Sequence, residues 1–121
     1  MHTLKMIATA TALGAIALFG AGEASAHAAL VKSNPAANAT VAAPKAISLT
    51  FNEPLTPAFS GFDMSMSDGM KMKLKTKVSK DKKTITGAPG KMMPGAYKVN
   101  WHAAATDDGH KTSGTLAFTV K

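Results

Sequence analysis

Apolar and polar residues alternate in short runs along the chain after residue 27, and Pro, Gly, Asn and Asp separate these runs. A two-residue period is typical of half-buried β-strands, and no run of useful length shows the 3.6-residue period of an amphipathic helix. Several short strands joined by turns predict a single all-β domain with the architecture of a β-sandwich. The seven expected strands lie within residues 27–33, 45–54, 59–67, 70–78, 82–87, 95–103 and 113–121.

The alternation also predicts which side chains face the core, because residues two apart on a strand point to the same side. His102 falls on the face opposite the apolar side chains of its strand, so we expect it in solvent and not at a ligand site. The residues expected on core faces include Ile47, Leu49, Phe51, Phe62, Met64, Met66, Tyr97, Val99 and Trp101.

The run 70–78 carries a lysine at every second position, Lys71 to Lys77, against apolar residues between them. We interpret the lysines as the outer face of an edge strand, where positive charge discourages pairing with another chain. Binding of a polyanion is the alternative interpretation.

Residues 1–26 have the pattern of a cleavable secretory signal peptide. Lys5 precedes an apolar stretch, Met6 to Gly20, which is short for a membrane span. The triplet Ala24-Ser25-Ala26 is an A-x-A cleavage pattern, so we expect export of the chain and a working domain of residues 27–121. The chain has no cysteine, so packing must hold that domain together without disulfides.

The charge of the chain, +7, is carried by lysine alone, since no arginine occurs among its fourteen cations. Proteins that read nucleic acid use the planar guanidinium group for bidentate contacts. We therefore expect no nucleic-acid partner, and a weak attraction to anionic surfaces instead.

Cleavage after Ala26 would make His27 the first residue of the working protein. An N-terminal histidine offers its amine and its imidazole Nδ1 to one metal ion, which an internal histidine cannot do. Two such nitrogens, with a further imidazole and a carboxylate, suit a tetragonal Cu(II) site.

Partners for such a site occur in two loops. Asp108 and His110 form an Asp-x-His triplet between the last two expected strands, and a locally extended loop would point both side chains the same way. Asp107 is an alternative to Asp108. Glu53 follows an expected strand and is a candidate weak ligand or hydrogen-bond acceptor for a ligand.

Five features occur together in this chain: His27 after "ASA", and the segments "SNPAANATV", "LTFNEPL", "DDGH" and "SGTLAFTVK". Through these features, residues 27–121 resemble the CopC family of periplasmic copper-binding proteins. The resemblance implies an immunoglobulin-like or cupredoxin-like Greek-key sandwich. It implies a Cu(II) site made by His27 through its amine and imidazole, Asp108 and His110, with Glu53 nearby. It also implies a monomeric copper carrier without catalysis, whose partner is an inner-membrane transporter of the CopD type or another periplasmic copper protein.

Four methionines flank a turn: Met64, Met66, Met70 and Met72. A two-residue turn would split them between both faces of a hairpin, whereas a three-residue turn with Gly69 in the left-handed region would place all four on the core face. Methionine packs irregular cores well, and its thioether also selects Cu(I). Some members of the resembled family have a methionine-rich Cu(I) site with a histidine in the stretch, which this chain lacks.

Two other functions are compatible with the sequence. One is an oxidative enzyme with a copper centre built on an N-terminal histidine, but the carboxylate of Asp108 would hinder oxygen activation and the chain shows no aromatic platform for a sugar. The other is a structural sandwich without metal, in which the position of His27 is a coincidence.

Overall fold

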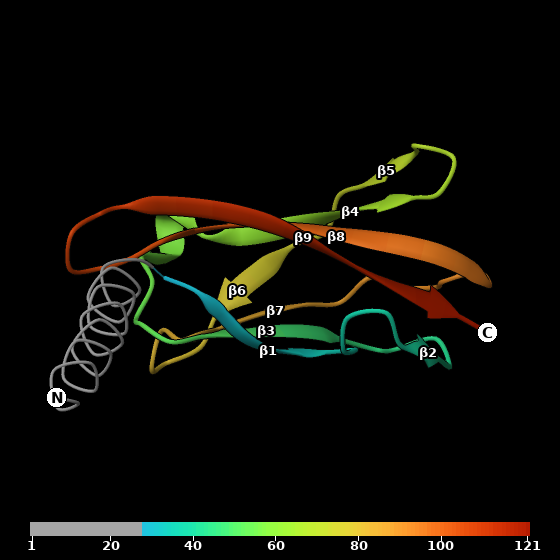
Figure 1. The fold of residues 1–121 in the computed structure, drawn as a ribbon, viewed down its shortest axis with the longest axis horizontal. Coiled ribbons are helices and arrows are strands. Elements are labelled where there is room, and N and C mark those ends of the chain that lie inside the picture. The colour runs from blue at the N-terminus through green and yellow to red at the C-terminus, as the bar shows by residue number, and fades with distance from the viewer. Residues whose placement is uncertain (1–27) are drawn as a thin grey trace, which may run out of the picture.

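The computed structural model describes residues 28–121, which form two β-sheets packed face to face (Figure 1). One sheet has the strand order β1-β3-β7-β6 and the other has the order β2-β9-β8-β4-β5. The signal peptide predicted for residues 1–26 and the predicted ligand His27 lie outside the described residues. The strands are β1 (Leu30–Asn34), β2 (Thr40–Val41), β3 (Ile47–Phe51), β4 (Gly61–Met66), β5 (Lys71–Met72), β6 (Thr76–Val78), β7 (Thr84–Gly87), β8 (Gly95–Ala104) and β9 (Lys111–Val120), and a 3-10 turn, η1 (Pro57–Phe59), precedes β4.

The predicted β-sandwich is confirmed. The chain leaves the four-stranded sheet after β1, after β3 and again after β7, and such connections between sheets are typical of Greek-key sandwiches. The described residues hold nine strands and not seven, because β2 adds a two-residue strand parallel to β9 and because one predicted strand is divided in two.

The single strand predicted for residues 70–78 is wrong. β5 pairs with β4 in the five-stranded sheet, whereas β6 pairs with β7 in the other sheet. Residues 73–75 carry the chain from the edge of one sheet to the edge of the other. The alternation continues through this crossing because both edges border the same core, so the pattern alone does not show where the chain changes sheets.

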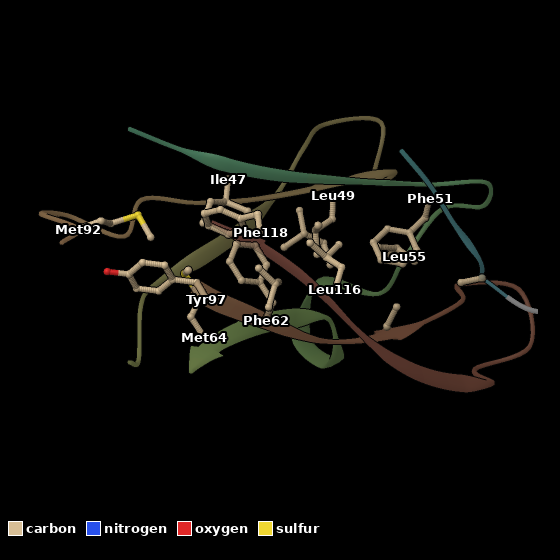
Figure 2. Close-up of a cluster of buried hydrophobic side chains, with 14 of the residues drawn as sticks. Ile47, Leu49, Phe51, Leu55, Phe62, Met64, Met92, Tyr97, Leu116 and Phe118 are labelled. Atoms are coloured by element: carbon tan, nitrogen blue, oxygen red, sulfur yellow. The ribbon is translucent and has the colours of Figure 1, made fainter. Parts of the chain in front are cut away.

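The core lies between the sheets and consists of the faces that the alternation predicts (Figure 2). Ile47, Leu49 and Phe51 of β3 are buried, and Phe51 meets the Trp101 ring edge to face at a centroid distance of 5.1 Å. Trp101 needs the bare backbone of Gly114 opposite it, because a Cβ there would lie 2.6 Å from the indole ring. The other buried apolar residues include Leu55, Phe62, Met64, Ile85, Tyr97, Val99, Leu116, Phe118 and Val120.

Candidate metal centre

The predicted ligand pair lies in the short loop between β8 and β9, at one end of the sandwich (Figure 1). The loop is closed by two backbone hydrogen bonds: the Ala105 N–H donates to the His110 carbonyl at 3.1 Å, and the Gly109 N–H donates to the Ala105 carbonyl at 2.9 Å. Gly109 has φ +69°, a left-handed conformation that glycine adopts without strain. These bonds make the loop a defined turn.

Asp108 and His110 are held next to each other by a side-chain hydrogen bond within the loop. Oδ1 of Asp108 accepts the backbone N–H of His110 at 2.9 Å, and both residues are exposed. The triplet does not have the locally extended conformation that would point both side chains the same way, since residues 106–108 form a turn and Gly109 is left-handed. A short aspartate side chain competes well for backbone donors in a turn, and here it draws the carboxylate to residue 110.

Glu53 reaches the same end of the sandwich through the segment that follows β3. The Thr106 N–H donates to the Pro54 carbonyl at 2.9 Å, and Leu55 forms an isolated bridge with Ala105. Glu53 is half-buried in the bend before Pro54. Its backbone is therefore tied to the base of the loop that carries the predicted ligands.

The start of the described chain is tied to this end as well. Thr112 Oγ1 donates to the Ala28 carbonyl at 3.0 Å, and Ala28 is buried. The Ala29 N–H donates to Asn52 Oδ1 at 2.8 Å, and the Asn52 N–H donates back to the Ala29 carbonyl at 3.0 Å. Residues 28 and 29 are thus held between the segment after β3 and the beginning of β9.

These anchoring roles of Asn52 and Thr112 are not visible in the sequence. Each joins residues far apart in the chain, by 23 positions for Asn52 and by 84 for Thr112. Asn52 offers one signal, since an asparagine directly after a strand often bonds to nearby backbone. Thr112 gives no such signal in the sequence, because a threonine at its place in the alternating pattern is an ordinary strand residue.

Among residues 28–121, the histidine, aspartate and glutamate side chains form no group of three or more that could hold a metal ion. Asp108, His110 and Glu53 therefore do not make a complete centre by themselves, and a site here needs a further donor. Over the same residues, no helix has the length and hydrophobicity needed to cross a membrane.

Of the two turns considered for the methionine hairpin, the structure has the three-residue one. Met64 pairs with Met72, the Met66 N–H donates to the Met70 carbonyl at 2.8 Å, and Gly69 has φ +88°. Met64 is fully buried and Met66 and Met72 are half-buried, but Met70 is 61% exposed. The placement of all four on the core face is wrong for Met70, because the tip of the hairpin projects beyond the opposite sheet (Figure 1).

His102 lies on the outer face of the five-stranded sheet, as predicted. It is exposed, and it stands between Gly61 of β4 and Ser113 of β9. The aliphatic and aromatic side chains of the same strand, including Val99, point into the core. His102 is therefore separate from the loop that carries Asp108 and His110.

The fold and this loop define a small β-sandwich with its candidate ligands on an end loop, and comparison with known proteins assigns the family. The CopC domain model matches residues 30–121, and the chain belongs to the CopC family. It is 36% identical to copper resistance protein C of Xanthomonas campestris pv. juglandis, over the full length of both chains. It is 40% identical to the protein YobA of Escherichia coli K12, over 79% of this chain and 80% of that protein.

Solved structures have the same fold. PcoC, a methionine rich copper resistance protein from Escherichia coli, superimposes with a TM-score of 0.72 at 36% identity, over 78% of this chain and 99% of PcoC. CopC from Methylosinus trichosporium OB3b superimposes with a TM-score of 0.73 at 32% identity, over 78% of this chain and 94% of that protein. The family expected from the sequence is therefore confirmed.

Proposed function

We propose that this chain is a copper-binding protein of copper resistance that carries Cu(II) in the periplasm. The copper is cargo, bound and handed over without bond-breaking chemistry. Relatives named copper resistance protein C and the solved structure of PcoC support the link to copper. Export depends on the signal peptide proposed for residues 1–26, and transfer to a membrane transporter of the CopD type or to another periplasmic copper protein remains part of the proposal.

One observation carries the proposed site: the hydrogen bond from Thr112 to the Ala28 carbonyl. It holds residue 28 at the start of β9, two positions after His110. His27 is joined to Ala28 by one peptide bond, and consecutive Cα atoms are about 3.8 Å apart. We infer that His27, once N-terminal, supplies the donor that Asp108 and His110 lack.

The donor chemistry fits Cu(II). Imidazole nitrogens, an amine and a carboxylate are ligands that this ion accepts in a tetragonal arrangement. The amine binds only after losing its proton, and an unperturbed α-amino group has a pKa of about 7.7–8.0. Copper affinity is therefore expected to fall as the pH is lowered below that range. Glu53 is proposed as a weak ligand or as an acceptor for a ligand at the base of the loop.

The decisive experiment compares Cu(II) binding by the chain that begins at His27 with binding by the same chain carrying one extra N-terminal glycine. The extra residue moves the amine away from the imidazole and leaves the fold unchanged. We expect near-stoichiometric, tight binding by the first chain and strongly weakened binding by the second. Equal binding by both would exclude the N-terminal amine as a ligand.

A matched pair of histidine variants tests the loop. His110→Ala is expected to weaken Cu(II) binding, whereas His102→Ala removes an exposed histidine of the outer sheet face and is expected to leave it unchanged. Equal effects of the two variants would mean that histidines bind copper without a specific site.

A site for Cu(I) at the hairpin is the second proposal, and it rests on the exposure of the methionines. Met64 is fully buried, so we assign it to packing. Met66, Met70 and Met72 are partly or largely exposed and flank one turn. Titration with Cu(I) of a variant in which these three are leucine tests the proposal, and unchanged binding would leave packing as their role.

A further inference from the structure

Four lysines form a row around one edge of the sandwich. Lys71 pairs with Ser65 on the outer face of the five-stranded sheet, and Lys77 pairs with Thr86 on the outer face of the other sheet, so the row passes from one outer face to the other. Lys71, Lys73, Lys75 and Lys77 are all exposed, and the residues between them are half-buried. The row begins in β5, the edge of the five-stranded sheet, crosses between the sheets and ends in β6, the edge of the other. In extended chain, alternate residues lie about 7 Å apart, so the row is about 20 Å long.

No carboxylate interrupts this row. Residues 70–80 contain no Asp or Glu, and residues 28–121 keep the net charge of +7 because Lys5 and Glu23 cancel. Asp63 lines a hollow together with Lys73, and its Oδ1 accepts a hydrogen bond from Asn100 at 2.9 Å. Along the chain the row is therefore free of negative charge, and Asp63 is the carboxylate that lies beside it, at Lys73.

The row borders a hollow of about 410 Å³ with a composition that suits an anionic headgroup. Lys75 and Lys77 supply charge, and Thr86 supplies a hydroxyl group. The remaining lining is small and apolar, from Ala46, Gly87 and Ala88, with no carboxylate. Lysine amines on flexible stems meet phosphate groups as point charges, without the fixed geometry that arginine imposes.

Protection of the two sheet edges does not by itself explain the row. Charge of either sign discourages edge pairing, and mixed signs would also relieve repulsion between neighbours about 7 Å apart. Four positive charges without a negative one between them along the chain are attracted to an anionic surface. We propose that the lysine row docks this protein on an anionic phospholipid bilayer, with headgroup phosphates in the hollow beside Lys75 and Lys77.

The proposal is independent of copper. The loop that carries Asp108 and His110 lies at the end of the sandwich opposite the β5 hairpin (Figure 1). A protein docked by the lysine row would keep that loop clear of the bilayer.

Flotation with vesicles tests the proposal on copper-free protein, using residues 27–121, which contain the whole sandwich and its core. One set of vesicles is pure phosphatidylcholine, and in the other phosphatidylglycerol replaces about a third of it. The salt concentration is about 0.01 M, where the screening length is about 30 Å, and then about 1 M, where it is about 3 Å. We expect binding only to the anionic vesicles and only at low salt.

Two variants with equal charge separate the row from net charge. The row variant replaces Lys71, Lys73, Lys75 and Lys77 by Gln, and we expect it to lose affinity on the order of 1000-fold, from the usual contribution of each surface lysine. The control variant replaces four exposed lysines elsewhere and is expected to lose less than about tenfold. Its positions are Lys32, Lys80, Lys91 and Lys121.

Several results would overturn the proposal. They are the absence of binding to anionic vesicles at low salt, equal losses in the two variants, and displacement from the vesicles by inorganic phosphate at constant ionic strength, which would indicate a site for small anions. Equally tight binding to duplex RNA would indicate a general polyanion surface and would overturn it as well. If the row variant does not fold by circular dichroism, K75Q/K77Q and K32Q/K121Q replace the two variants, with an expected loss on the order of 30-fold for the first.

Discussion

The hydrogen bond between Thr112 and Ala28 is the contact that places the N-terminal segment beside the candidate metal loop, and Thr112→Val removes it with little change of shape. Ala28 is 2% exposed, so its carbonyl would lose its partner without gaining water. A buried carbonyl left without a partner destabilises a protein by about 1–3 kcal/mol. The two bonds between Ala29 and Asn52 remain, so we expect a loss near the lower end, about 1 kcal/mol.

The same change should weaken copper binding. If Cu(II) must first restore the position of residue 28 in the variant, the affinity falls by the free energy of that step. About 1 kcal/mol corresponds to roughly a fivefold higher Kd. Urea unfolding without metal measures the first effect, and competition for Cu(II) with a chelator, on chains that begin at His27, measures the second.

Thr115→Val is the matched control, because Thr115 lies on the same strand and is exposed. It should leave both stability and affinity nearly unchanged. A Thr112→Val protein that is less stable but binds Cu(II) as tightly as the parent would refute the reasoning. The N-terminal segment would then be placed at the metal by something other than this hydrogen bond.

Three further predictions concern stability and can be measured by urea unfolding. Gly114→Ala should destabilise by about 1–3 kcal/mol, because its Cβ would lie 2.6 Å from the rigid ring of Trp101; an unchanged midpoint would show that β9 moves freely there. Met64→Ala should cost about 2–5 kcal/mol through the cavity it leaves, while Met64→Leu should cost less than about 1.5 kcal/mol. The hydrogen bond from Ser79 lowers the pKa of Asp81 below its usual 3.8. The stability that the ionised Asp81 carboxylate contributes is therefore present above pH 3.8 and is lost as the pH falls through the pKa of Asp81 in the folded protein. Asp81→Asn should therefore be less stable than the parent at neutral pH and equal to it in strong acid, and a constant difference at all pH values would contradict this origin.

Much of the fold could be predicted from alternation, because a strand with one face in the core must repeat every two residues. Ile47, Leu49 and Phe51 show this in β3, where all three are buried as expected. The crossing at residues 73–75 could not be predicted, since the pattern records burial and carries no information on which strand is the neighbour. Met70 was misplaced for a related reason: alternation does not show where a hairpin passes the edge of the opposite sheet.

The candidate site could be predicted in part. The spacing of Asp108 and His110 identified the loop, and the structure holds the two residues together by a local hydrogen bond. The turn conformation itself was missed, because an aspartate side chain that bonds to its own loop replaces the extended geometry that spacing suggests. The contact between Thr112 and Ala28 depends on the tertiary fold, and no local rule predicts a bond between residues 84 positions apart.

The N-terminal segment and the candidate metal loop are far apart in the sequence, and this separation has a consequence for how the protein would respond to copper. The chain has no cysteine, so no disulfide cross-links its first strand to the rest of the fold, and β1 is an edge strand. A copper ion shared by His27 and the loop of Asp108 and His110 would act as such a cross-link, closing a loop of about eighty residues across both sheets. Cross-links that close loops of this size stabilise a fold by about 4–5 kcal/mol in the chain-entropy description. Loading would then lock the N-terminal strand onto the sandwich, and fraying of that strand would be a natural route by which copper leaves.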